Sequence, residues 1–271
     1  MKRALKWTGI ILLTLIGVIF LIGWVMNEPL PEGETGPEAD ALAERMMDAV
    51  NKQAWDTTRF VTWTFNSAIL DPHNFVWDKT NNVVQVTWQD YQVVVINDLV
   101  EGEAYQNGVL ISDPELHDNL VKKAWAFFCN DSFWLNAVVK AFDPGVERRL
   151  IKQEEGNDAL LVTYSSGGVT PGDSYLWILD DDGRPNAWQM WVKVLPIGGI
   201  KTSWQDYKEL PGGALVAQNH FNGERGVKIQ DLNAAQDLQD LAVDATLLAN
   251  LTTTAFPQQV TQEASDSTSL Q

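Results

Sequence analysis

The hydropathy pattern begins with an unbroken apolar run. From Trp7 to Met26 there are 20 residues without a charge, and a helix of that length spans about 30 Å, the hydrocarbon thickness of a bilayer. Basic residues precede the run and acidic residues follow it. The pattern predicts a single-pass transmembrane helix over residues 1–27, with the N-terminus in the cytoplasm and the large domain outside.

A cleaved signal peptide is the alternative interpretation of this run. Its apolar region is usually only about 7–15 residues long and ends in a small-residue cleavage site. Here the run ends in Gly23-Trp24-Val25-Met26, and no cysteine follows directly that a lipid could modify. The sequence favours an uncleaved anchor in the cytoplasmic (inner) membrane, with the large domain on the periplasmic side.

Three later segments have apolar residues at helical spacing. After a linker rich in Pro, Gly and Glu over residues 28–36, residues 37–54 predict an amphipathic helix. Residues 113–128 open with Asp-Pro, a helix start signal, and continue with an apolar stripe. Residues 234–251 have the same helical spacing and predict a C-terminal helix.

Between these helices the period changes from helical to alternating. Two turn signals, at residues 180–183 and 210–213, each lie between alternating segments and predict hairpins. Successive short strands of this kind predict an α+β fold with a mainly antiparallel, curled sheet in one domain over residues 37–251. Residues 252–271 are rich in Thr, Gln and Ser and predict a disordered tail. The alternating segments are residues 59–65, 84–88, 91–96, 159–164, 174–179, 187–194, 200–207 and 214–221.

The charge of the chain is distributed unevenly. Lys2, Arg3 and Lys6 are the charged residues among the first 27, so a chain with a formal net charge of −17 carries −20 beyond them. A surface this acidic repels phosphate groups, which argues against binding to nucleic acid and against docking on lipids by a basic patch. Cys129 is the single cysteine, so no disulfide within the chain supports the fold.

The sequence contains no pattern typical of a metal site or a catalytic centre. His73, His117 and His220 have no second histidine or cysteine at ligand spacing, and His73 lies in a predicted turn. The acidic run at residues 180–183 could suggest calcium, but it lacks the alternating acids and closing Glu of a calcium loop. We therefore predict no cofactor and no enzyme activity.

Tryptophan is the most informative residue type. Several indoles lie on the apolar faces of predicted strands, where they either fill a core or line a cavity. A bent sheet with large apolar side chains on one face must cover that face with a helix, an apolar ligand or both. The candidate ligand-binding residues are Trp63, Phe65, Val84, Val86, Trp88, Trp125, Phe128, Trp177, Trp188 and Met190.

Four segments, at residues 55–65, 76–79, 142–146 and 168–175, resemble a bacterial family of mostly uncharacterised exported proteins. That family is similar in turn to the periplasmic lipoprotein carriers and outer-membrane lipoprotein-sorting proteins. The resemblance implies a half-closed β-barrel with a helical plug, whose hollow holds acyl chains. The chain departs from the carriers in its predicted transmembrane anchor, and no position is matched to their internal arginine.

These observations give three functional hypotheses. The first is a lipid- or lipoprotein-binding domain tethered to the cytoplasmic membrane. The second is a non-catalytic scaffold or interaction protein of a cell-envelope complex. The third is an enzyme, whose main candidate catalytic residues are the adjacent Glu154 and Glu155. Adjacent charges on a loop are usually only solvated.

Overall fold

The computed structural model describes residues 23, 25, 27–153 and 156–255. The predicted anchor thus falls almost wholly outside the described residues, as does the predicted tail from residue 256 onward. Within the described part, no helix is both long and apolar enough to cross a bilayer. The described chain forms two large antiparallel sheets and a few helices, which confirms the α+β class.

The larger sheet has nine described strands in the order β12-β13-β14-β1-β2-β3-β4-β5-β6. Its neighbouring strands are antiparallel, and its two edges, β12 and β6, do not pair with each other. The sheet therefore stays open and does not close into a barrel. Its strands are β1 (Phe60–Ser67), β2 (His73–Asp78), β3 (Val83–Trp88), β4 (Tyr91–Ile96), β5 (Glu101–Gln106), β6 (Val109–Leu110), β12 (Gln205–Glu209), β13 (Leu215–Asn222) and β14 (Arg225–Ala235).

The smaller sheet has the order β11-β10-β9-β8-β7 in the described chain and is open as well. The chain passes from the smaller sheet to the larger one at Trp204, which lies between β11 and β12. The indole of Trp204 is buried. The single strand predicted over residues 200–207 is therefore wrong. The five strands are β7 (Val146–Ile151), β8 (Ala159–Tyr164), β9 (Asp173–Leu179), β10 (Pro185–Trp191) and β11 (Ile200–Ser203).

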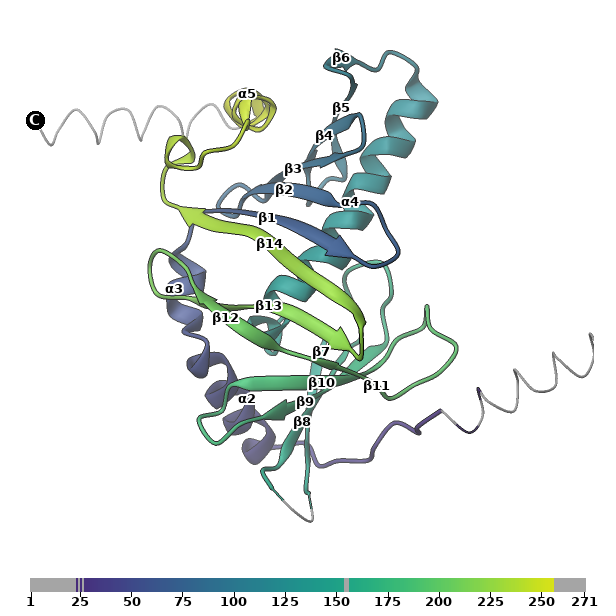
Figure 1. Ribbon diagram of the computed structural model, residues 1–271, viewed down its shortest axis with the longest axis vertical. Coiled ribbons are helices and arrows are strands. Elements are labelled where there is room, and N and C mark those ends of the chain that lie inside the picture. Colours follow the sequence, from purple (N-terminus) through teal and green to yellow (C-terminus); the bar gives the residue numbers. More distant parts are fainter. Residues whose placement is uncertain (1–22, 24, 26, 154–155, 256–271) are drawn as a thin grey trace, which may run out of the picture.

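The helices cover different faces of the sheets (Figure 1). Helix α4 (Pro114–Asn136) packs on one face of the larger sheet, and α5 (Thr246–Ala255) packs on the other. Helix α2 (Pro37–Ala49) packs against the smaller sheet and leads into α3 (Lys52–Thr57). Two short 3₁₀ helices complete the described elements, η1 (Ala137–Lys140) and η2 (Leu238–Asp240).

Three helix boundaries differ from the prediction. The helix predicted over residues 37–54 is divided at Asn51, which takes a left-handed conformation and caps α3 by accepting a hydrogen bond from the Ala54 N–H at 3.2 Å. Helix α4 starts where Asp113 predicts and continues past residue 128 to Asn136. The C-terminal helix starts later than predicted, because β14 occupies the chain as far as Ala235.

The segment between the predicted anchor and α2 is extended and bound to the domain. Glu34 and Leu150 exchange two backbone hydrogen bonds, at 3.0 and 2.8 Å, so the segment runs beside β7. The residues predicted as a linker, 28–36, are therefore docked on the smaller sheet along part of their length.

Candidate functional site

Side chains that alternate along the central strands form three rows on the face of the larger sheet that α4 covers, which we term the α4 face. Strand register brings them together, because residues on one face of antiparallel neighbours lie directly opposite each other. The rows are Val61, Trp77, Val84 and Val95; Trp63, Phe75, Val86 and Val93; and Phe65 with His73 beside Trp88 with Tyr91.

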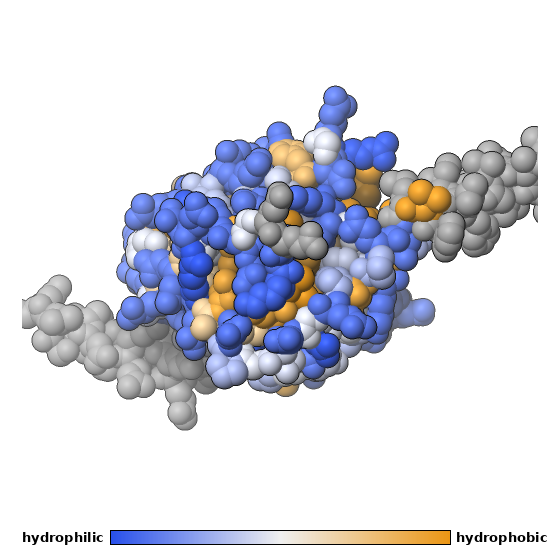
Figure 2. Space-filling model, turned by 90° about the horizontal axis from the view of Figure 1, so that it is seen from below, coloured by the Kyte–Doolittle hydropathy of each residue, from blue (hydrophilic) through white to orange (hydrophobic). Residues whose placement is uncertain are grey.

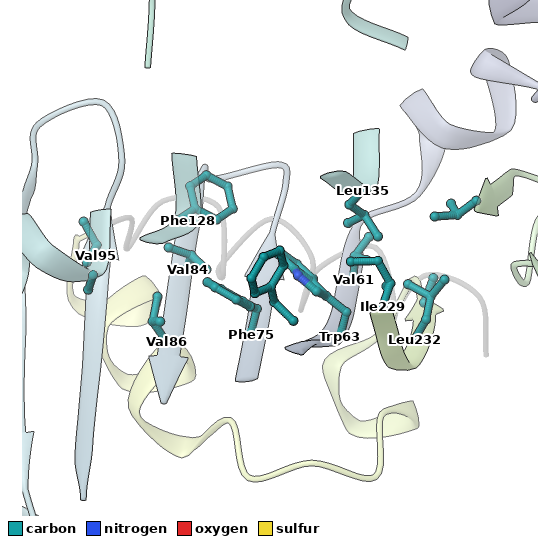
Figure 3. Close-up of a cluster of buried hydrophobic side chains, with 14 of the residues drawn as sticks. Val61, Trp63, Phe75, Val84, Val86, Val95, Phe128, Leu135, Ile229 and Leu232 are labelled. Atoms are coloured by element: carbon teal, nitrogen blue, oxygen red, sulfur yellow. The ribbon is translucent and has the colours of Figure 1, made fainter. Parts of the chain in front are cut away.

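Helix α4 fills the space above these rows with its own aromatic side chains. The ring of Phe128 lies 6.4 Å from Trp63 and 5.1 Å from Trp77, and that of Phe127 lies 5.3 Å from Trp88. Figure 3 shows Trp63 beside Phe75 on neighbouring strands, with Phe128 of α4 facing the same cluster. The α4 face is therefore covered by the helix and packed with protein atoms.

The ten candidate ligand-binding residues lie in two separate clusters. Trp177, Trp188 and Met190 belong to the core of the smaller sheet, under α2. The other seven belong to the α4 face or pack against it: Trp63, Phe65, Val84, Val86, Trp88, Trp125 and Phe128. They line two packed cores rather than one shared hollow, and the cavity between these cores, beside Leu135 and Trp204, has a volume of about 10 Å³, which holds at most one water molecule.

A buried polar pair joins α4 to the sheet. Nδ1 of His73, at the start of β2, donates a hydrogen bond to Oδ2 of Asp131 on α4 at 2.6 Å, and both side chains are almost fully buried. Asn130 donates to the other carboxylate oxygen at 2.8 Å, and Phe127 stacks on the imidazole with ring centroids 3.8 Å apart. Burial raises the pKa of the Asp131 carboxyl, and the hydrogen bonds from His73 and Asn130 oppose that rise.

Within the described chain, no nucleophilic side chain is hydrogen-bonded to the pair. Among the described residues, Asp131 is the side chain that hydrogen-bonds to the His73 ring, and no Ser, Thr or Cys does so. The predicted turn at His73 is also wrong, because the residue begins strand β2. The geometry gives the pair a positioning role between α4 and the sheet.

Three indole N–H groups on the α4 face have no acceptor in the described part of the chain. They are Nε1 of Trp63, Trp77 and Trp88, which come from three adjacent strands. A buried donor without a partner costs about 1–3 kcal/mol relative to one that is satisfied. Such a cluster of donors in an apolar bed fits an apolar ligand that also carries hydrogen-bond acceptors.

A second aromatic cluster joins the two sheets. Trp188 lies 5.0 Å from both Trp177 and Trp204 and 4.9 Å from Trp134 of α4. His220 of β13 completes this cluster, 4.3 Å from Trp204, and burial lowers the pKa of its imidazole to about 3, although the nearby Ser203 and Ala217 backbone slightly favours the charged form. Its two ring nitrogens lack a partner of normal hydrogen-bond geometry among the described residues. The histidine is therefore neutral at physiological pH.

A wider hollow opens on the surface between α2 and the β7–β8 hairpin. Its volume is about 580 Å³. Figure 2 shows hydrophobic residues near the centre of the face seen from below, among largely hydrophilic ones. Charged groups of both signs surround the hollow, and Lys152 bridges Glu38 and Asp158 at 3.3 and 3.0 Å. Its apolar lining consists of Ala41, Leu42, Leu150 and Leu179. The hollow is open to solvent and shares no residue with the α4 face.

Metal and thiol chemistry find little support in the described chain. No group of three or more His, Cys, Asp and Glu side chains there could hold a metal ion. Burial raises the pKa of Cys129 to about 11, so its thiol is not an activated nucleophile.

The fold and site define an α+β protein with two open antiparallel sheets and a helix packed on an aromatic sheet face. No protein-family model matches the chain, and no curated protein matches it. Among solved structures, it is similar to a DUF1329 family protein from Desulfovibrio piger at 12% identity and a TM-score of 0.38, over 77% of this chain and 98% of that one. This likeness is too distant to assign a fold or function, and it gives no support to the resemblance to lipoprotein carriers.

Proposed function

We propose that this chain is a non-catalytic protein, tethered to the outer face of the cytoplasmic membrane, that binds an acylated ligand on the α4 face. The ligand is a lipid or a lipoprotein acyl group, and α4 is the helical plug that moves aside to admit it. The observation that carries the proposal is the set of three unpartnered indole N–H groups of Trp63, Trp77 and Trp88 in an apolar bed. Ester and amide carbonyls of an acylated ligand are acceptors for such donors.

The energetics of exchange favour a ligand that replaces the aromatic contacts of α4. Each methylene moved from water onto the sheet contributes about 0.8 kcal/mol, so a long acyl chain offsets much of the burial that α4 provides. Acceptors on the ligand add to this by satisfying donors that remain unpaired beneath the helix.

The His73–Asp131 pair supports the proposal that helix α4 can move away from the sheet. A buried polar pair is often no more stabilising than apolar residues of the same size, and its best-attested role is to fix register or act in a switch. Here the hydrogen bond holds α4 in one position over the sheet, but it stabilises that position less than an apolar contact of the same size would. Once the helix moves, water solvates both groups.

The proposal is tested by creating space on one face of the larger sheet at a time. Phe128→Ala removes a ring from the α4 face, and Phe60→Ala removes the same ring from the opposite face, under α5. Both variants lose about 3–5 kcal/mol of stability. The full chain is extracted in mild detergent, exposed to a fluorescent acyl ester, and analysed by fluorescence and native mass spectrometry.

We expect the wild-type chain to take up the acyl ester, Phe128→Ala to bind it more tightly, and Phe60→Ala to bind like the wild type. A hydrocarbon of the same length should bind more weakly than the ester, since it offers no acceptor to the indoles. Equal uptake by the two variants, or no uptake by any form, contradicts the proposal. The packed interior then favours the second candidate, a non-catalytic interaction protein of the cell envelope.

A further inference from the structure

Two surface loops of the smaller sheet are joined into one unit, which we term the loop pair: residues 165–172 between β8 and β9, and residues 192–199 between β10 and β11. The buried carboxylate of Asp173 accepts hydrogen bonds from the Lys193 backbone N–H at 2.9 Å and from the Thr170 hydroxyl at 2.5 Å. The Lys193 ammonium donates to the Pro171 carbonyl. The two loops therefore present a single surface.

The loop pair exposes aliphatic side chains. Val194 is 71% exposed, Val169 is 48% exposed and Leu195 is 38% exposed. Neither loop contains an acidic residue, although the chain has 36 of them, and the one charge in the pair is Lys193. The loops themselves therefore add no negative charge to the surface, and the acidic side chain packed on them is that of Glu28, which lies against Gly199. Exposed aliphatic side chains on loops with no acidic residue of their own are typical of a lipid-contacting site.

The chain enters the domain at this same surface. Gly198 donates its N–H to the Asn27 side chain at 2.8 Å and accepts from the Glu28 N–H at 3.2 Å, and Trp191 donates to the Glu28 carbonyl at 2.8 Å. At Gly199, which has a positive φ, a Cβ atom would lie 2.5 Å from Glu28, so the close approach requires glycine. Figure 1 shows this entry at the opposite end of the molecule from α5.

We infer that the loop pair rests on the lipid bilayer, with Val169, Val194 and Leu195 in the headgroup region of the outer leaflet. This inference rests on the proposed membrane tether. The apolar run ends at Met26 and the next residue, Asn27, is already bound to the loop pair, so no spacer separates the bilayer from this surface. The domain is thereby held in one orientation, with β6 and the start of α4 directed away from the membrane.

The test places a nitroxide spin label on the full chain in lipid nanodiscs. Val194→Cys reports on the loop pair, and Val109→Cys in β6 is the matched control, because Val109 is 70% exposed in the structure. Both are made with Cys129→Ser. Relaxation of each label is compared for lipid-soluble oxygen and for a water-soluble nickel chelate. We expect a several-fold higher oxygen-to-nickel ratio at residue 194 than at residue 109.

A second comparison labels Val169→Cys and replaces neighbouring apolar residues. Val194→Asp with Leu195→Asp should make this label accessible to the nickel chelate, and Val109→Asp with Leu110→Asp should leave it unchanged. If residues 194 and 109 are equally accessible to nickel in a chain that co-purifies with the nanodisc, the loop inference is wrong and the tether stands. A chain that does not co-purify with the nanodisc overturns both, whichever result the acyl-ester assay gives.

Discussion

Replacement of His73 by phenylalanine tests whether the buried pair positions α4. The substitution keeps a flat ring that can stack on Phe127, but it removes the donor to Asp131, whose carboxylate is then left almost fully buried with Asn130 as its remaining side-chain partner. Removing the partner of a buried carboxylate, so that its charge is left under-compensated, usually costs about 3–5 kcal/mol. We expect a loss in this range for His73→Phe at pH 7.

A double-mutant cycle separates the pair from the packing around it. Asp131→Asn leaves His73 an amide oxygen as acceptor, and should cost about 1 kcal/mol, the difference between a hydrogen bond to a charged group and one to a neutral group. The double variant His73→Phe with Asp131→Asn contains no orphaned charge. It should therefore be more stable at pH 7 than His73→Phe alone.

The pH dependence has a definite sign. Burial already raises the folded-state pKa of Asp131, and loss of the His73 hydrogen bond raises it further. Between the unfolded and folded pKa values the native state then binds the additional proton, so the free energy of unfolding falls as the pH rises. The cost of His73→Phe should be largest at neutral pH and smaller near pH 5.

Urea unfolding of the full chain in nanodiscs, followed by tryptophan fluorescence at pH 5 and pH 7, measures these quantities. Additive losses in the double variant, or a His73→Phe cost that is the same at both pH values, would refute the positioning role of the pair. If the pair holds α4 in place, His73→Phe should also speed uptake of the acyl ester.

Three further predictions concern other parts of the chain. Because the folded-state pKa of His220 is about 3, protonation of the unfolded chain should lower stability by about 2 kcal/mol between pH 6.5 and 5, and His220→Phe should remove that slope in urea titrations. Asp113→Ala deletes the cap that accepts from the Leu116 N–H at 2.7 Å and should cost about 1 kcal/mol, whereas Asp118→Ala, which breaks an exposed pair with Lys122, should cost less than about 0.5 kcal/mol by the same assay. Cys129, with its pKa raised to about 11, should react with a maleimide at pH 8 far more slowly in the folded chain than in urea; equal rates contradict its burial.

Local patterns predicted the strands whose apolar residues alternate. The segments at residues 84–88, 91–96 and 159–164 correspond to β3, β4 and β8, and the two turn signals join β9 to β10 and β12 to β13. These elements were predictable because alternation and turn chemistry depend on neighbouring residues. Val84, Val86 and Trp88 share a buried face for the same reason.

Other elements gave weaker local signals. Strand β14 spans Arg225–Ala235 and has polar residues on its exposed side. Its last two residues also fit a helical pattern. Strand β2 follows Asp71-Pro72, which is typical of a turn. Both segments form strands because each pairs with β1. Strand β14 hydrogen-bonds to one side of β1 and strand β2 to the other.

The candidate site was predicted in part. Sequence patterns identified Trp63, Trp88 and Phe128, but they did not identify Trp77 or the pair formed by His73 and Asp131. The two members of that pair are 58 positions apart, and neither has a neighbour that indicates its partner. Only the packing of α4 on the sheet brings them together.

The amino-acid sequence by itself determined the acidic balance, the apolar run at residues 7–26, the single cysteine and the faces of most strands, because these are properties of composition and short-range periodicity. The tertiary structure decided which aromatic side chains share a core, that α4 fills the face it covers, and that Asn27 meets the loop pair. Those outcomes depend on strand register and on contacts between residues far apart in the chain, which no local pattern encodes.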